Sequence, residues 1–187
     1  MIPVGEEAGA EKPPEANVAV LGLGNVLMGD DAFGPTVVKV LEAEYEFPPG
    51  VSVQDLGTPG LDLTPYLAGL RAAIVVDTVR AGGAPGEVRL YRRDEILKNP
   101  PQPRLSPHDP GLKEALLTVE FSGSGPREVL LVGVIPAGVE TGVGLSPAVQ
   151  GAVRSAAAAV VTELARLGVA PSARAVPDPL DLWWERT

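Results

Sequence analysis

Hydrophobic positions along the chain follow two spacings. Continuous apolar runs, bounded by Gly, Pro or Asp, are typical of strands buried on both faces of a parallel sheet. Such runs predict strands at residues 17–22, 72–76 and 128–135, and a further short strand is predicted at residues 51–55. Elsewhere apolar residues recur at the spacing of a helix with one buried face. This second pattern predicts helices at residues 33–44, 63–70, 111–117 and 146–167.

Strands that alternate with helices predict an α/β fold, with three layers (α/β/α) around a mostly parallel, twisted sheet. Residues 87–91 alternate apolar with polar positions after a Gly-rich turn, which indicates an antiparallel edge strand. We expect a single domain at residues 17–170. A flexible, acidic N-terminal tail is expected at residues 1–16 and a C-terminal tail at residues 171–187.

Composition and charge exclude several classes of function. The formal net charge of −9 disfavours binding to nucleic acid or to anionic membrane surfaces, because both need clustered Lys and Arg. The absence of cysteine excludes thiolate catalysis, disulfides and Cys-type zinc sites. No apolar run approaches the roughly 20 residues of a membrane span, and residues 1–16 lack the features of a secretory signal. We therefore expect a soluble, cytoplasmic protein.

Each of the first three predicted strands ends at or near a carboxylate. The stretch at residues 18–34, VAVLGLGNVLMGDDAFG, carries Asp30 and Asp31 on a Gly-rich turn, and Asp55 and Asp77 lie at the ends of the next two strands. Because ligands of open α/β sheets bind beyond the carboxyl ends of the strands, these side chains should converge. Their mutual repulsion then calls for a cation or a shared proton. Helix capping is the alternative role, above all for Asp30.

His108 is the only histidine of the chain and stands between two prolines. It belongs to the Pro-rich segment at residues 99–110, and long irregular loops in compact domains are often functional. Two carboxylates, Asp31 and Asp77, and one imidazole form a donor set that suits a divalent ion such as zinc or nickel. A surface histidine without a function is the alternative.

Dinucleotide binding is a rival interpretation of the first turn. Gly22 and Gly24 follow a strand, as in a dinucleotide fingerprint, but Leu27 stands where the third glycine is needed. The two adjacent aspartates would also repel a pyrophosphate group. The sequence therefore favours a cation over a phosphate at this turn.

Proteolytic chemistries can be compared in the same way. A Ser-His-Asp triad would have to use His108, and no Gly-x-Ser-x-Gly motif occurs. A His-Glu-x-x-His zinc helix is impossible with a single histidine. Aspartic-protease chemistry, with Asp31 and Asp77 as paired carboxylates, stays open.

A series of short motifs occurs in order between residues 18 and 168. They are GLGN at 22–25, DDAFG at 30–34, DLGTPG at 55–60, VVD at 75–77, APG at 84–86, SPH at 106–108, VGVIP at 132–136 and GLSP at 144–147. Each motif is weak alone, but the ordered set is specific. With this set the chain resembles the hydrogenase maturation proteases, endopeptidases that trim the C-terminus of the large subunit of nickel–iron hydrogenases.

The resemblance implies a metal-dependent endopeptidase that removes a C-terminal extension from the nickel-loaded precursor of a nickel–iron hydrogenase large subunit. It places both the nickel ligands and the catalytic residues at Asp31, Asp77 and His108. Family members carry Glu or Asp at the first of these positions. The substrate is expected to supply the nickel, and zinc or cadmium to replace it in vitro. The residues implied to line the site or bind the peptide are Asp55, Gly57, Thr58 and Gly60.

A non-catalytic module that binds a nucleotide or a metal in the same cleft is the alternative function. The resemblance also leaves the role of the metal open between three kinds of chemistry. It can act as a Lewis acid, activate a water molecule, or position the peptide.

Overall fold

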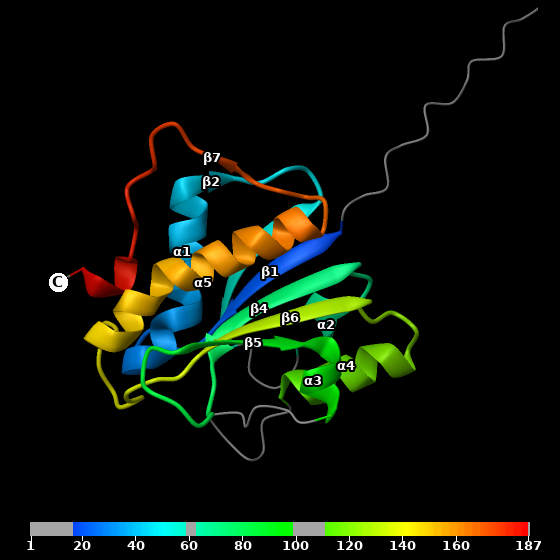
Figure 1. Ribbon diagram of the computed structural model, residues 1–187, viewed down its shortest axis with the longest axis horizontal. Coiled ribbons are helices and arrows are strands. Elements are labelled where there is room, and N and C mark those ends of the chain that lie inside the picture. The colour runs from blue at the N-terminus through cyan, green and yellow to red at the C-terminus, as the bar shows by residue number, and fades with distance from the viewer. Residues whose placement is uncertain (1–16, 59–62, 99–110, 187) are drawn as a thin grey trace, which may run out of the picture.

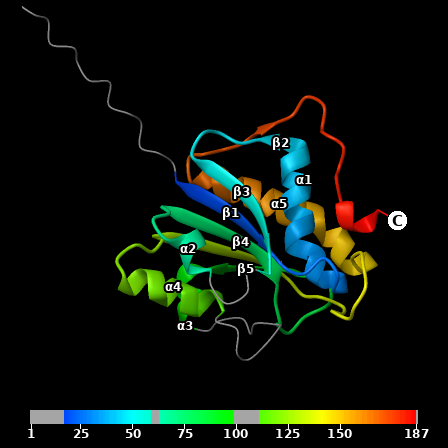
Figure 2. The same ribbon diagram turned by 180° about the vertical axis from the view of Figure 1, so that it is seen from behind.

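A five-stranded sheet forms the middle layer of the protein, with helices on both faces (Figures 1 and 2). The computed structural model describes residues 17–58, 63–98 and 111–186. The strand order is β3-β1-β4-β6-β5, and only β5 runs antiparallel to its neighbour in this sheet. The predicted α/β fold and its antiparallel edge strand are confirmed. The five strands are β1 (Val18–Leu23), β3 (Val51–Gly57), β4 (Ala72–Thr78), β5 (Val88–Arg92) and β6 (Glu128–Val134).

Helices α1 and α5 cover one face of the sheet, and α2, α3 and α4 cover the other. Two short 3-10 helices are also present: η1 immediately precedes α1, and η2 lies near the C-terminus. No helix in the described ranges combines the length and the apolar composition that a membrane span requires. The helices are α1 (Phe33–Glu44), α2 (Thr64–Leu67), α3 (Arg93–Lys98), α4 (Leu112–Phe121), α5 (Pro147–Arg166), η1 (Gly29–Ala32) and η2 (Trp183–Glu185).

Two predicted boundaries are wrong in ways that bear on the site. The strand predicted at 72–76 extends to Thr78, because Asp77 and Thr78 pair with Gly133 and Val134 of β6. The strand predicted at 51–55 likewise extends to Gly57, so that Asp55 lies within β3 rather than at its end. Polar side chains at the ends of these strands made both look like loop residues.

Other differences concern short elements. The helix predicted at 63–70 ends at Leu67, because Ala68 is extended and Gly69 adopts a left-handed conformation with φ of 75°. The hydrophobic pattern predicts neither α3 nor the two-stranded sheet of β2 (Tyr45–Glu46) and β7 (Ser172–Ala173). These elements are too short to show a hydrophobic period.

Side chains of the central strands alternate between two hydrophobic cores. Ile74 and Val76 of β4 belong to the core under α1 and α5, whereas Ala73 and Val75 belong to the core under α2, α3 and α4. A strand buried on both faces needs an apolar side chain at every position, which explains the continuous apolar runs. The same period places Thr78, at the end of β4, on the face that α1 covers.

The chain changes direction across the sheet beside β1. It passes from β1 to β3 on one side and then crosses back to β4 on the other side. The carboxyl ends of β1 and β4 therefore form a topological switch point, where open α/β sheets bind ligands. Asp31 follows β1, and Asp77 and Thr78 end β4, so the fold brings these three residues to this point.

Gly34 allows α1 to begin directly on the switch point. A Cβ atom on Gly34 would lie 2.2 Å from the carbonyl oxygen of Leu23 and 2.5 Å from that of Val76. On β1, a Cβ atom on Gly22 would lie 2.7 Å from the carbonyl oxygen of Gly34. Because neither glycine leaves room for a side chain, the first turn of α1 contacts the backbone of β1 and β4, and η1 is fixed just before it.

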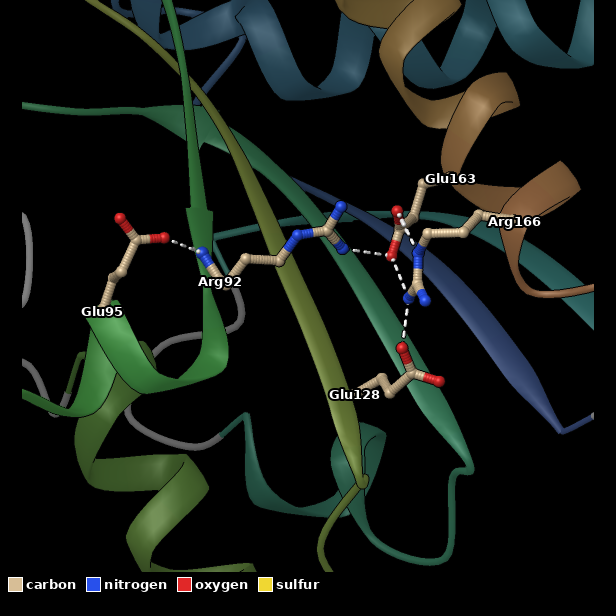
Figure 3. Close-up of polar contacts among 5 residues, drawn as sticks. All are labelled: Arg92, Glu95, Glu128, Glu163 and Arg166. Atoms are coloured by element: carbon tan, nitrogen blue, oxygen red, sulfur yellow. Dashed lines mark hydrogen bonds and ion pairs between the residues drawn. The ribbon is translucent and has the colours of Figure 1, made fainter.

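A cluster of charged side chains ties α5 to β5 and β6 at the opposite end of the sheet (Figure 3). Glu163 is only 4% exposed. Its Oε1 accepts hydrogen bonds from Nη1 of Arg92 (2.5 Å) and Nη2 of Arg166 (2.8 Å), and Arg166 also binds Glu128. Burial raises the pKa of Glu163, but the hydrogen bonds and charges of Arg166 and Arg92 outweigh it and lower the pKa to about 2. Glu163 is therefore ionised at neutral pH.

The C-terminal segment packs against the domain. The backbone N–H of Asp178 donates to the carbonyl oxygen of Ala43 at the end of α1 (2.9 Å), and Trp184 is 6% exposed. Trp184 lines a pocket of about 660 Å³ together with residues 143–145 and Gln150. The segment predicted as a C-terminal tail thus contributes a buried aromatic side chain to the structure.

Candidate active site

The loop after β1 is closed by the carboxylate of Asp31. Gly24 has a φ of 140°, and a Cβ atom on it would lie 1.8 Å from the carbonyl oxygen of Asp31. The backbone N–H of Asn25 donates to Oδ2 of Asp31 (2.8 Å), and the backbone N–H of Leu27 donates to Oδ1 of Asn25 (3.0 Å). Asp31 is 1% exposed. The sequence of this turn therefore holds a buried carboxylate at the carboxyl end of β1.

Thr78 links the two carboxylates that follow β1 and end β4. Its hydroxyl oxygen lies 3.2 Å from Oδ1 of Asp31 and 3.3 Å from Oδ1 of Asp77. The backbone N–H of Thr78 donates to the same Asp77 oxygen at 2.7 Å. Thr78 is 4% exposed. The structure thus brings Asp31 and Asp77 together, on either side of one buried hydroxyl group.

The motif analysis did not identify Thr78. A threonine at the end of a strand is ordinary, because its branched side chain suits a pleated surface. The two-residue period of β4 could have identified it, since Thr78 continues the side of Ile74 and Val76, the side on which α1 and η1 lie. Asp77 continues the opposite side, together with Val75 and Val79.

Asp30 has a structural role next to the site. Its carboxylate accepts four hydrogen bonds, from the backbone N–H groups of Ala137 (2.7 Å), Gly138 (3.1 Å) and Ser146 (2.6 Å) and from the Ser146 hydroxyl (3.0 Å). Burial raises the pKa of Asp30, but these hydrogen bonds outweigh it and lower the pKa below the ordinary value. Ser146 is the N-cap of α5, so Asp30 holds the start of that helix.

Asp55 lies apart from this pair. It is exposed on β3, pairs in register with Gly22, and accepts the backbone N–H of Gly57 at its own Oδ1 (2.9 Å). The Gly57 carbonyl accepts the N–H of Gly24 (2.9 Å), which ties the end of β3 to the loop after β1. Thr58 is exposed, and Gly60 lies outside the described residues. In the described part of the chain, Asp55 is thus a neighbour of the loop rather than a contact of Asp31 or Asp77.

His108 lies outside the described residues, so its position relative to the two aspartates stays a prediction. Within residues 17–58, 63–98 and 111–186, no three His, Cys, Asp or Glu side chains are arranged to hold a metal ion. The described residues contribute two carboxylates on a chain of strongly negative charge. This donor set attracts a cation, and a third ligand is needed to complete a protein site for zinc or nickel.

Similarity to known proteins identifies the family of this chain. Residues 35–163 match the sequence model described as hydrogenase maturation protease. The chain belongs to this family. Its members are endopeptidases and therefore hydrolases, which favours an enzyme over the alternative of a non-catalytic binding module.

Alignments with individual hydrogenase maturation proteases cover most of the chain. It is 38% identical over 159 residues to the hydrogenase expression/formation protein HupM of Azotobacter chroococcum mcd 1, over 84% of this chain and 76% of that protein. It is 35% identical over 156 residues to the hydrogenase 2 maturation protease of Escherichia coli K12, over 81% and 93% of the two chains. The solved hydrogenase maturating endopeptidase HybD from E. coli aligns with a TM-score of 0.76 at 34% identity, over 84% and 98%. The resemblance found in the sequence motifs is confirmed.

Proposed function

We propose that this hydrogenase maturation protease removes a C-terminal extension from the nickel-loaded precursor of a nickel–iron hydrogenase large subunit, in the cytoplasm. The observation that carries the proposal is the pairing of Asp31 and Asp77 at the switch point of the sheet, linked through Thr78. The family supplies the reaction class, and the paired carboxylates supply a place where a metal-bearing peptide can bind.

In this proposal the nickel is part of the substrate. Asp31 and Asp77 contribute carboxylate oxygens to it and His108 contributes an imidazole nitrogen, a donor set that suits nickel, zinc or cadmium. Two carboxylates held close together repel each other, and a bound cation relieves that repulsion. A precursor that carries nickel is thereby favoured over one that does not. Bound nickel can polarise the scissile carbonyl, activate water or orient the peptide.

His108 belongs to the segment that joins α3 to α4 in the sequence. These two helices cover the face of the sheet on which Asp77 lies, whereas Asp31 precedes α1 on the other face. Ligands from both faces can meet only beyond the carboxyl ends of the strands. The connectivity of the chain therefore supports the assignment of His108 as the third ligand.

A processing assay tests the proposal. We expect purified protein to shorten a nickel-loaded precursor and to leave a nickel-free precursor intact, as measured by mass spectrometry of the large subunit. Equal cleavage of both precursors would overturn recognition through nickel and favour direct aspartic-protease chemistry by the two carboxylates.

Variants assign the residues. Asp77→Asn and His108→Ala are expected to abolish processing while their thermal midpoints stay close to that of the wild type. Asp178→Asn is a matched control, because Asp178 lies beside the C-terminal end of α1 and is exposed. If the site variants process like this control, Asp77 and His108 are not the ligands.

A further inference from the structure

We infer that Thr78 is a positioning residue of this site, whose hydroxyl proton holds the Asp31 carboxylate in the orientation that processing requires. The inference rests on the proposed function, because it assigns Thr78 a role toward Asp31. Nothing in the composition or motifs of the chain points to this residue. The geometry at the end of β4 does.

The backbone of Thr78 is fixed by the sheet. Thr78 is paired with Val134 of β6, and the next N–H group, of Val79, donates to the Val134 carbonyl oxygen at 2.8 Å. A side chain on a paired strand cannot change faces without breaking the pairing. The Thr78 hydroxyl is therefore held on the α1 side of the sheet, where η1 presents Asp31.

The hydroxyl group has one proton and two carboxylate neighbours. It lies 3.2 Å from Oδ1 of Asp31 and 3.3 Å from Oδ1 of Asp77. A hydroxyl donates to one acceptor at a time. Asp77 Oδ1 already accepts the backbone N–H of Thr78 at 2.7 Å. We therefore assign the hydroxyl proton to the hydrogen bond with Asp31.

With that proton, each oxygen of Asp31 has a donor from a different part of the fold. Oδ1 accepts the Thr78 hydroxyl of β4, and Oδ2 accepts the Asn25 N–H of the loop after β1, at 2.8 Å. These two donors, at fixed positions, both constrain the rotation of the carboxylate about its χ2 bond. Hydrogen bonds to ionised groups are the strong ones. Removing the Thr78 donor should therefore loosen Asp31 without removing its charge.

Thr78→Val and Thr78→Ser separate the hydroxyl from the shape of the side chain. Valine keeps the branched shape and lacks the donor, whereas serine keeps the donor and loses a methyl group. We expect Thr78→Val to lower kcat for the nickel-loaded precursor about 10- to 100-fold, with KM changed much less. Thr78→Ser should restore most of kcat, an effect that a purely structural role of the methyl group would not produce.

Thr36→Val is the matched control. Thr36, in the first turn of α1, is similarly buried, at 2% exposure, and its hydroxyl donates to the carbonyl oxygen of Ala32, the last residue of η1 (2.7 Å), rather than to a carboxylate. The Thr36→Val variant measures how much stability is lost when a buried threonine hydroxyl near the site is removed. We expect Thr36→Val to lower the thermal midpoint and to leave kcat of the folded protein at the wild-type value.

A second measurement is independent of the precursor. In full-length protein with ¹³C-labelled aspartate, the Asp31 Cγ resonance is assigned by its loss in Asp31→Asn. Thr78→Val should shift this resonance at pH 7, whereas Thr78→Ser and Thr36→Val should leave it close to the wild-type position. An unshifted Asp31 resonance in Thr78→Val, or wild-type kcat in that variant, would overturn the inference. A wild-type protein that leaves nickel-loaded precursor uncut contradicts the proposed function instead, and the resonance still decides whether Thr78 holds Asp31.

Discussion

Asp30 accepts the backbone N–H of Ser146 at 2.6 Å, and this hydrogen bond joins the start of α5 to the loop that carries Asp31. Two further contacts join the same segments, since Gly29 N–H donates to the Gly142 carbonyl oxygen (2.8 Å) and Gly142 N–H donates to that of Leu27 (3.0 Å). The loop between β6 and α5 therefore holds the segment that carries Asp31 in place. Adjacent aspartates thus differ in role, because one holds the loops and the other faces β4.

Asp30→Asn should destabilise the protein strongly. An amide replaces one acceptor oxygen by an NH₂ donor, which would face N–H groups of residues 137–146 instead of accepting from them. We expect the free energy of unfolding to fall by about 2–4 kcal/mol, because a buried hydrogen bond to a charged group is lost and a donor is left unpaired. Urea unfolding at pH 7 measures this change. The exposed Asp178→Asn control should change stability by less than about 1 kcal/mol, and equal losses would contradict the assigned role of Asp30.

Gly34→Ala should be among the most damaging small substitutions in the chain. Its Cβ atom would lie 2.2 Å and 2.5 Å from two backbone carbonyl oxygens, so that α1 must move away from β1 and β4. We expect a loss of about 3 kcal/mol or more, or failure to fold, since overpacking against backbone cannot be relieved by side-chain rotation.

Gly151→Ala is the same chemical change as Gly34→Ala, but we expect it to raise the stability of the protein. Gly151 lies within α5, is exposed, and has no heavy atom within 4 Å of an added Cβ. Alanine there should stabilise the protein by about 0.5–1 kcal/mol, because glycine is a poor helix former. Thermal unfolding of both variants makes the comparison. If Gly34→Ala proved as stable as Gly151→Ala, the contact of α1 with the strand ends would not be as tight as the structure has it.

Much of this fold follows from local pattern. The limits of α1 were predicted to the residue, because an apolar face, a Pro in the first turn and a polar end mark it clearly. Antiparallel β5 was predicted from its alternating pattern. The strand order, in contrast, depends on which strands pair across long sequence separations, and no local pattern encodes this. The alternation of β4 side chains between the two faces of the sheet is a local pattern. Its consequence for Thr78 depends on knowing that α1 covers the face on which Thr78 lies.

The site shows the same division. Motifs marked Asp31 and Asp77, and the fold places both at the carboxyl ends of neighbouring strands. Motifs could not show that Asp30 binds a loop more than 100 residues further along the chain, since its partners are backbone N–H groups that every residue has. Positions of backbone donors are set by tertiary structure. The roles of adjacent aspartates therefore became distinct only in three dimensions.

Glu163 is the carboxylate whose ionisation most clearly supports the fold away from the site (Figure 3). Its pKa lies at about 2, below its ordinary value of 4.5, because Arg166 and Arg92 outweigh the effect of burial. A lowered pKa means that the folded protein binds the proton more weakly than the unfolded chain does. The stabilisation is therefore complete above about pH 4.5 and is lost as the pH falls from 4.5 toward 2.

Glu163→Gln should remove this acid-sensitive stabilisation. At pH 7 we expect the free energy of unfolding to fall by about 2–3 kcal/mol, because the amide leaves Arg92 and Arg166 without their shared charged partner. Urea unfolding of both proteins at pH 7 and pH 3 measures the difference, which should shrink at the lower pH as wild-type Glu163 loses its advantage. Glu128→Gln is the control, since the Glu128 side chain is 43% exposed and binds Arg166 from the surface. It should cost less than about 1 kcal/mol. A Glu163→Gln loss that is the same at both pH values would show that packing, rather than charge, accounts for the role of this residue.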